Sequence, residues 1–452
     1  MSFDISAPKG WQLVKLSDLG EVNRGKSKHR PRDAHFLYGG KYPFIQTGDV
    51  KASSGRINSF NQTYSNEGLK QSRLWPVDTM CITIAANIAE TGVLQFPACF
   101  PDSVIGFIAD KTKCDVYFIE YMFRLLKAKI KAQANGSVQE NINLQTLERI
   151  HFPIPDLATQ EKIAQALGVI DDKIVQNNQM NETLEQMAQA LFKSWFVDFE
   201  PVKAKIAVLE AGGSQAEATL AAMTAISGKD ADALAVFERE HPEQYAELKA
   251  TAELFPASMQ ESEMGGIPEG WDSQRLSNLA TLHYGKALKK TERIEGPYPV
   301  YGSGGVTGSH NNYLVEGPGI VVGRKGSIGT LYWEDGKFHP IDTVYYVANK
   351  KGIPLSYLYY LMKTLNLPNM NTDAAVPGLN RDNVYRLEVL KPAQSILSKF
   401  DDHMSTIKNI IQKNDNSTVT LTDLRDTLLP KLLSGEINLP EAEQSVSEVE
   451  NV

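Results

Sequence analysis

The feature that most constrains this chain is a pair of long amphipathic helices with one shared apolar pattern. Over residues 157–196, apolar side chains recur every three or four positions, which is typical of a helix that buries a narrow seam. The pattern returns 237 positions later, with an asparagine at the same point of each seam. Since neither seam is expected to face water alone, we predict that the two helices pair with each other. The seam positions are Ile163, Leu167, Ile170, Ile174, Asn177, Leu184 and Leu191 in the first helix and Phe400, Met404, Ile407, Ile411, Asn414, Leu421 and Leu428 in the second.

The segments that precede the helices are duplicated too. A Gly-Trp pair at Gly10 returns 260 positions later, at Gly270, and both are followed by Leu-Ser, Leu and Gly-Lys at the same spacing. The later matches, at the helices' own offset of 237, are Gly92 with Gly329, Asn143 with Asn380, and Pro155 with Pro392. The chain is therefore a tandem duplication whose second copy has lost a net 23 residues between its lead-in and its middle.

This duplication predicts an α+β protein in which two mixed α/β domains are separated by two long helices. Each copy holds short β-rich runs, such as residues 92–96 and their counterpart 327–333, then a helix and a closing strand. An antiparallel coiled coil would make the chain pseudo-twofold symmetric, and the length of the connector leaves a parallel pair open. The predicted parts are a first domain at 1–155, a first helix at 156–199, a helical connector at 200–265, a second domain at 266–392, a second helix at 393–436 and an acidic tail at 437–452.

The charge of the chain is divided between basic and acidic segments. The net charge is -8, but residues 1–155 hold 19 Lys and Arg against 14 Asp and Glu, and residues 266–392 hold 14 against 11. The remaining segments, 156–265 and 393–452, which include the predicted helices, the connector and the tail, carry the acidic excess. Two mildly basic domains can bind double-stranded DNA despite an acidic total.

Other classes of protein are disfavoured by the composition. No run approaches eighteen apolar residues and the start has no secretory signal, so we expect a cytoplasmic protein without a membrane segment. The three cysteines include no CxxC pair, which argues against a disulfide framework or a structural metal site. No HExxH, GxSxG or Walker A motif occurs, so no cofactor or catalytic residue is predicted.

Candidate DNA contacts in the first copy lie in a loop that holds five cations in nine residues. Cations in a loop can neutralise phosphates, and the alternative is a solvated basic loop. A polar segment that follows Phe44 supplies two further candidates. The first-copy candidates are Arg24, Lys26, Lys28, Arg30, Arg32, Gln46 and Thr47.

Candidate contacts in the second copy lie in three segments. Three lysines occupy the place of the basic loop. The glycine-rich run at residues 302–308 fits no nucleotide-binding motif, and we expect a flexible loop that lets the backbone approach DNA, followed by asparagines able to pair with adenine. Arg324 and Lys325 join two predicted strands, where they could hold phosphate, read guanine or only form a turn. The second-copy candidates are Lys286, Lys289, Lys290, Ser303, Asn311, Asn312, Arg324 and Lys325.

Together these features resemble the specificity (S) subunit of type I restriction-modification systems. The resemblance covers the whole chain and is carried by the Gly-Trp lead-ins, the LFKSWFVDF string from Leu191 to Phe199, and the LRDTLLPKLLSGE string from Leu424 to Glu436. It implies two target-recognition domains on an antiparallel helical spacer, each reading half of a bipartite DNA site. It also implies two methyltransferase (M) subunits that use S-adenosylmethionine and two motor-nuclease (R) subunits that use ATP, with no catalysis by this chain.

Two other functions remain open. A self-sufficient DNA methyltransferase is disfavoured because no cofactor loop is visible in the sequence. A coiled-coil scaffold without DNA specificity would bind DNA regardless of sequence or not at all. The connector at 200–265 is either a tolerated linker or an insert that docks a partner.

Overall fold

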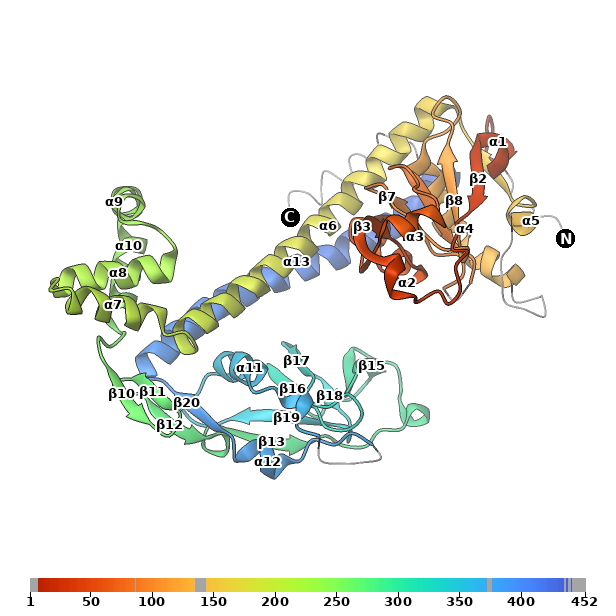
Figure 1. Cartoon of the computed structure of the whole chain (residues 1–452). Helices are drawn as coiled ribbons and strands as arrows, with labels where there is room; N and C mark the ends of the chain where they lie inside the picture. The colour runs from red at the N-terminus through yellow and green to blue at the C-terminus, as the bar shows by residue number, and fades with distance from the viewer. Residues whose placement is uncertain are drawn as a thin grey trace. The chain divides into compact units, whose positions relative to one another are not determined.

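The computed structural model describes residues 7–85, 87–134, 144–371, 376–434, 436, 437 and 440. They form two compact units, one made of Met1–Gln179 with Asn414–Val452 and the other of Met180–Lys413. Each unit contains a part of both long helices, α6 at Leu157–Phe196 and α13 at Gln394–Ser434 (Figure 1). The predicted helices extend one to three residues too far at their ends. Asn143 and most of the predicted acidic tail lie outside the described residues.

The core of the first unit is a five-stranded sheet packed against helix α4. The strand order is β2-β8-β6-β7-β4, in which β4 joins β7 in parallel and the other neighbours are antiparallel. All five residues of β6 are buried, so both faces of this central strand are covered. The elements are β2 at Gly20–Arg24, β4 at Gly55–Ile57, β6 at Thr79–Thr83, β7 at Thr91–Leu94, β8 at Val104–Ala109 and α4 at Val116–Ala134.

Smaller elements complete the first unit. Strand β1 pairs antiparallel with β9, so the lead-in closes against the strand that precedes α6. Strands β3 and β5 form a second, two-stranded sheet. The bounds are β1 at Gln12–Lys15, α1 at Leu16–Leu19, η1 at His35–Leu37, β3 at Tyr38–Phe44, α2 at Thr47–Ala52, β5 at Gln62–Tyr64, α3 at Asn66–Lys70, α5 at Leu144–Leu147 and β9 at His151–Ile154.

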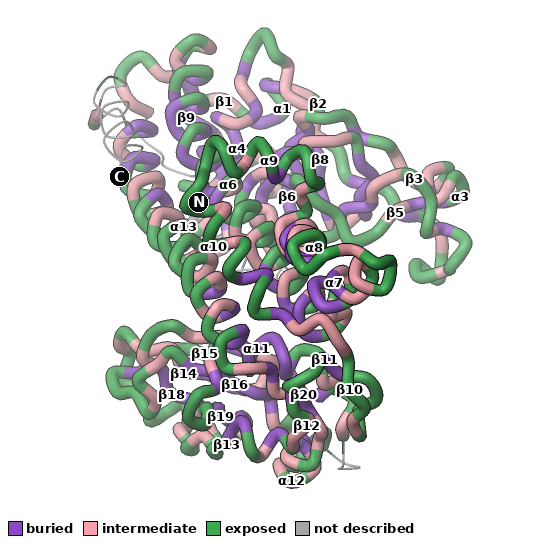
Figure 2. Tube along the Cα trace, turned by 90° about the vertical axis from the view of Figure 1, so that its left-hand side faces the viewer, coloured by how far each residue is buried: buried purple, intermediate pink, exposed green. Residues whose placement is uncertain are grey.

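The second unit is built around a four-stranded antiparallel sheet in the order β13-β19-β16-β17. Every residue of β16 is buried, and Figure 2 shows buried positions along β16 and β19. Helix α11 packs on this sheet through buried Tyr357 and Leu358. The elements are β13 at Ala280–Tyr284, β16 at Gly319–Gly323, β17 at Leu331–Glu334, β19 at Val344–Asn349 and α11 at Leu355–Thr364.

A three-stranded sheet, a strand pair and short helices surround the main sheet of the second unit. Strand β12 pairs antiparallel with β20, and β14 lies between β15 and β18. The bounds are β12 at Asp272–Arg275, η2 at Leu276–Asn278, η3 at Lys290–Glu292, β14 at Tyr298–Gly302, β15 at Gly305–His310, β18 at His339–Pro340, η4 at Leu367–Asn369, α12 at Arg381–Tyr385 and β20 at Glu388–Lys391.

The connector forms four helices and a β-hairpin within the second unit. Lys205 on α7 is buried, and its Nζ donates to the carbonyl oxygens of Ala252 (3.1 Å) and Phe255 (2.6 Å), which fastens α7 to the end of α10. The prediction of short helices is correct here. The elements are α7 at Glu200–Glu210, α8 at Gln215–Ser227, α9 at Ala231–Glu240, α10 at Pro242–Glu253, β10 at Met259–Ser262 and β11 at Gly265–Pro268.

The two main sheets repeat one strand order, with a register that corrects the sequence match. Gly25 donates its main-chain N–H to Val104 O, and Gly285 donates in the same way to Val344 O. The two glycines are 260 positions apart, but the two valines are only 240 positions apart. In the loop that follows β6 and β16, the residue that matches Gly329 is Ala89, not Gly92, because the N–H groups of both donate to the last residue of that strand. Both have left-handed backbone angles, with φ of 68° at Gly329 and 60° at Ala89. The second copy has therefore lost 20 residues before β16 and three residues after β19.

Two further predictions about the second copy are wrong. Residues 302–308 are not a flexible loop, because β14 ends at Gly302 and β15 begins at Gly305, which leaves a two-residue hairpin turn. The predicted strand at 327–333 begins only at Leu331. Apolar alternation alone could not separate the tight turn from the strand that follows it.

Within each unit, the two long helices lie against each other. In the first unit, Asp171 contacts Arg425 and Asn177 contacts Ser417, so the partner's number falls as the number along α6 rises, and the two segments run antiparallel. In the second unit, Phe192 and Trp195 pack against Phe400, with ring centroids 5.8 and 6.1 Å apart. Of the seam positions, Leu184, Leu191, Ile407, Ile411 and Asn414 are half-buried and the others are buried.

Candidate nucleic-acid interface

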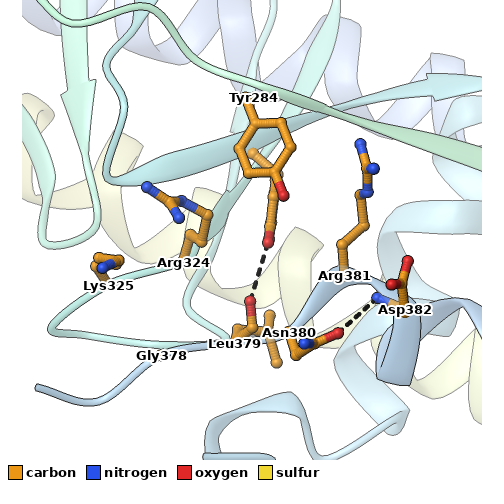
Figure 3. Close-up of a pocket in the computed structure, with 9 residues that line it drawn as sticks. Tyr284, Arg324, Lys325, Gly378, Leu379, Asn380, Arg381 and Asp382 are labelled. Atoms are coloured by element: carbon orange, nitrogen blue, oxygen red, sulfur yellow. Dashed lines mark hydrogen bonds between the residues drawn. The ribbon is translucent and has the colours of Figure 1, made fainter. Parts of the chain in front are cut away.

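A polar cavity of about 260 Å³ opens on the second unit where four chain segments meet (Figure 3). Tyr284 comes from the end of β13, Tyr345 from β19, and Arg324 from the turn that follows β16. The fourth segment, which precedes and begins α12, is fixed beside that turn because Leu379 N donates to Arg324 O (2.9 Å). Tyr345 OH in turn donates to Leu379 O (2.9 Å). The complete lining is Tyr284, Arg324, Lys325, Tyr345, Gly378, Leu379, Asn380, Arg381 and Asp382.

Two arginines approach the same tyrosine ring in this cavity. The guanidinium carbons of Arg324 and Arg381 lie 5.2 and 5.0 Å from the centre of the Tyr284 ring. In the view of Figure 3 the two arginine side chains lie on opposite sides of this ring. Arginine stacks favourably on aromatic faces, so Tyr284 contacts both cations.

The hydrogen bonds of the two arginines differ. Arg324 donates from Nε (3.0 Å) and Nη2 (2.6 Å) to the carbonyl oxygen of Asp342, which fixes one edge of its guanidinium. Arg381 Nε is buried and has no hydrogen-bond partner among the described residues. A buried donor without an acceptor costs free energy, so Arg381 Nε is a candidate donor to a ligand.

The cavity carries an excess of positive charge. Arg324, Lys325 and Arg381 line it, against one carboxylate, that of the exposed Asp382. Within the part of the chain that the structure describes, none of these three cations forms an ion pair. Burial raises the pKa of Tyr345 to about 12, so this phenol stays neutral near pH 7 and does not offset the cations.

Only some of the predicted DNA contacts of the second copy lie at this cavity. Arg324 and Lys325 line it, and Ser303 lies nearby, since its carbonyl oxygen accepts from Thr330 Oγ1 (2.7 Å) in the loop after Lys325. The others do not line the cavity and are exposed, and Lys289 forms an ion pair with Glu292 at 3.9 Å. These outlying candidates are Lys286, Lys289, Lys290, Asn311 and Asn312.

Sequence reasoning missed Tyr284, Asn380 and Arg381 as members of this site. Asn380 caps α12 because its Oδ1 accepts from the main-chain N–H groups of Asp382 (2.8 Å) and Asn383 (3.2 Å), which positions Arg381 at the first residue of that helix. One signal was available, since Asn380 is a repeat match. The residue of the first copy that matches Arg381 is Leu144.

The predicted basic loop of the first unit is only partly free. Arg32 Nη2 donates to both carboxylate oxygens of Asp102, at 2.8 and 2.9 Å. Arg30 Nη1 donates to Ser27 O (2.7 Å) and His29 O (2.8 Å). Arg24, Lys26 and Lys28 are exposed. The loop therefore offers fewer available cations than its sequence suggests.

Of the two polar candidates at the start of α2, Gln46 is already hydrogen-bonded within the fold. Gln46 Nε2 donates to Gln62 Oε1 (2.6 Å), and the Gln46 N–H donates to Asp49 Oδ2 (2.7 Å). Thr47 is half-buried as the first residue of α2. In the sheet register above, the first-unit position of Arg324 is occupied by buried Ile84. The cationic cavity thus has no counterpart at this position in the first unit.

A buried ionic network joins three helical segments within the first unit. Asp171 on α6 pairs with Arg124 of α4 at 3.1 Å and with Arg425 of α13 at 2.9 Å, and it accepts from Tyr121 OH at 2.8 Å. Burial by itself would raise the pKa of Asp171, but the charges of the two arginines hold that pKa below its ordinary value. Burial raises the pKa of Glu120, which Arg124 Nε contacts at 2.8 Å.

The position that matches Asp171 in the second unit is Lys408, and its surroundings differ. Lys408 Nζ lies 3.6 Å from the centre of the Trp333 ring, and burial lowers its pKa to about 8. His403 on the same helix is half-buried, and its ring lies 5.8 Å from that of Trp195.

The three cysteines are free and buried. Within the described ranges, no helix combines the length and the apolarity needed to cross a bilayer. Among the same residues, no group of three or more His, Cys, Asp or Glu side chains is arranged to hold a metal ion.

Comparison with known proteins identifies the family. The model of the type I restriction modification DNA specificity domain matches this chain twice, over residues 8–186 and 268–416. The chain belongs to this DNA specificity family. Each match begins at a lead-in and ends within a long helix, so a type I specificity domain here includes part of the helix that follows it. The family predicted from the sequence is confirmed.

Individual type I specificity subunits agree with this assignment. The chain is 31% identical over 368 residues to the HindI specificity subunit of Haemophilus influenzae, with 73% of this chain and 80% of that one covered. It is 22% identical over 477 residues to the MjaIX specificity subunit of Methanocaldococcus jannaschii, with 96% and 95% covered. The crystal structure of a type I S subunit from M. genitalium shares the fold, with a TM-score of 0.51 at 16% identity and with 96% and 98% covered.

Proposed function

We propose that this chain is the non-catalytic DNA-reading subunit of a type I restriction-modification complex. Each repeat reads one half of a bipartite site in double-stranded DNA, and the two repeats read different halves. The observation that carries this proposal is one sheet topology repeated with different loop chemistry, since Arg324 in one repeat matches Ile84 in the other. A shared scaffold with divergent loops suits the recognition of two different half-sites.

The helices are proposed to act as the spacer between the two readings. They would form an antiparallel coiled coil with pseudo-twofold symmetry, supported by the contacts of Asn177 and of Asp171 with α13. A helix of 40 residues is about 60 Å long at about 1.5 Å per residue. Half-sites on one face of a duplex recur about every 34 Å, so a rod of this length can separate two readings.

The partners proposed are two M subunits and two R subunits. The M subunits would supply methyl transfer from S-adenosylmethionine, and the R subunits the motor and nuclease. The outer faces of α6 and α13 are the proposed docking surface for the M subunits, supported by exposed apolar side chains there. These are Val169, Met180, Met187, Ile410 and Val419.

The test is a map of methylated bases in the DNA of cells that carry this chain with and without its M partner. We expect a two-part motif with a fixed gap that requires both genes. Replacing residues 11–150 with those of a relative should then change one half of the motif and leave the other half and the gap unchanged. A change in both halves, or in neither, would refute the proposed division of reading.

Two alternatives predict different results. A self-sufficient methyltransferase would transfer methyl groups when the purified chain meets DNA and S-adenosylmethionine alone, and we expect no transfer. A scaffold without specificity would bind the mapped motif and a scrambled duplex equally in a gel-shift series at moderate salt. We expect a preference for the motif of at least about 1,000-fold in the assembled complex.

A further inference from the structure

We infer that the cavity between Tyr284, Arg324 and Arg381 binds a phosphate group. The main ligand we infer is a backbone phosphate of the DNA, and in this respect the inference rests on the proposed function. The same chemistry would also suit a free phosphate ester. The experiment below separates these two sources.

The first argument is charge. Arg324, Lys325 and Arg381 converge on one cavity, and the lining contains a single carboxylate, Asp382. Like charges held close together repel, and the repulsion is strengthened where water is partly excluded. An arrangement of this kind is stabilised by an anionic ligand. Stacking on Tyr284 holds the two guanidinium groups in place before any ligand arrives.

The second argument is the supply of hydrogen-bond donors. Arg381 Nε is buried and has no hydrogen-bond partner among the described residues, while Arg324 donates from Nε and Nη2 to Asp342 O. A phosphate presents several acceptor oxygens in different directions, so one group can satisfy donors that approach from two sides. A base edge presents its few acceptors in one plane.

The third argument is shape. Base edges lie at the floor of the DNA grooves, so a side chain that reads them has to project from the protein surface. Arg324 and Arg381 do the opposite, since both are half-buried in a cavity. Phosphates project outward from the duplex and can enter a recess. The shape therefore favours a phosphate over the guanine contact that the sequence leaves open for Arg324.

The test uses the full chain, with Arg381→Gln as the variant and Arg386→Gln as its matched control. Arg381 is chosen because its buried Nε has no hydrogen-bond partner among the described residues, whereas Arg324 helps to fix the turn. Arg386 is an exposed arginine five residues further along, so its replacement removes the same charge outside the cavity. The melting temperatures of both variants should match that of the wild type, which shows that they fold.

DNA affinity is then measured against salt concentration for two duplexes of different sequence. For Arg381→Gln we expect the slope of log affinity against log salt to fall by about one and the affinity to fall about tenfold on both duplexes. Arg386→Gln should change neither by as much. A loss of affinity on one duplex but not on the other would overturn the inference, because it would indicate a contact to a base.

A second arm uses inorganic phosphate and adenosine monophosphate without DNA. A rise in the melting temperature of the wild type, absent in Arg381→Gln, with an unchanged salt slope on DNA would assign the cavity to a free phosphate. If neither arm responds to Arg381→Gln, the inference is overturned. If the wild type shows no sequence preference at all, the proposed function fails, and the phosphate arm alone then decides the cavity.

Discussion

The side chain of Asn177 on α6 points at the backbone of its own repeat counterpart, Asn414 on α13. The Asn177 Nδ2 group lies 3.4 Å from the Asn414 carbonyl oxygen, 3.2 Å from Ser417 Oγ and 3.4 Å from Thr418 Oγ1. Asn177 is 6% exposed, so this polar contact is made inside an otherwise apolar seam. Buried asparagines in helical seams fix one register at some cost in stability.

Replacing Asn177 with leucine should raise stability and weaken the register. The hydroxyls of Ser417 and Thr418 can turn to carbonyl groups of their own helix, so no buried group is left without a partner. We expect the free energy of unfolding in urea to rise by about 1 kcal/mol, since an apolar side chain would fill the seam. Asn178→Leu, at an exposed neighbour, is the control and should change it by less than about 0.5 kcal/mol. A loss of stability in Asn177→Leu alone would contradict this account of the seam.

Lengthening both helices should lengthen the gap in the methylated motif. Four residues inserted after Gln179 and four after Lys413 add about 6 Å and about 40° of rotation to the proposed spacer. One base pair adds about 3.4 Å and about 35°. The mapped motif should therefore gain one or two base pairs in its gap and keep both halves. An unchanged gap would show that the helices do not set the spacing.

Removing the carboxylate of Asp171 should destabilise the protein mainly near neutral pH. The Asp171 side chain is 4% exposed and forms ion pairs with two arginines. Asp171→Asn should therefore lower the free energy of unfolding by about 3 kcal/mol at pH 7. The folded pKa of Asp171 lies below the ordinary 3.8, so the folded state binds fewer protons than the unfolded state around that pH. The contribution is present above about pH 5 and disappears as the pH falls through the folded pKa.

Urea unfolding between pH 3 and pH 7 measures this effect. The difference between wild type and Asp171→Asn should shrink at the acid end. Asp172→Asn is the matched control, because that neighbouring side chain is 64% exposed and its ion pair with Arg56 contributes under about 1 kcal/mol. Equal losses in the two variants would mean that the buried network does not stabilise the first unit.

Because of Lys408, the free energy of unfolding should increase as the pH rises above neutral. Its folded pKa of about 8 lies below the ordinary 10.5, so between these values the folded state binds fewer protons than the unfolded state. Stability should therefore increase from pH 7.5 to 9.5 by on the order of 1 kcal/mol, since the nearby Trp333 ring partly stabilises the cation. Lys408→Met should flatten this rise in thermal unfolding, and Lys413→Met, at an exposed lysine on the same helix, should retain it. A rise that survives in Lys408→Met would assign it to another group.

The sequence by itself determined the elements that depend on local periodicity and on repetition. The spacing of apolar residues located α6 and α13 to within three residues, because a helix must place its buried side chains every three or four positions. The repeated lead-ins revealed the duplication, and the string from Leu424 to Glu436 revealed the family.

Only the tertiary structure decided which distant residues meet. Tyr284, Arg324 and Arg381 are separated by 40 and 57 positions, and they converge because β19 lies between β13 and β16 while the segment before α12 is bonded to the turn after β16. No local pattern encodes strand order, since any strand with a buried face can pair with several others. The same holds for Asp171 and Arg425, whose contact requires the antiparallel direction that the sequence left open.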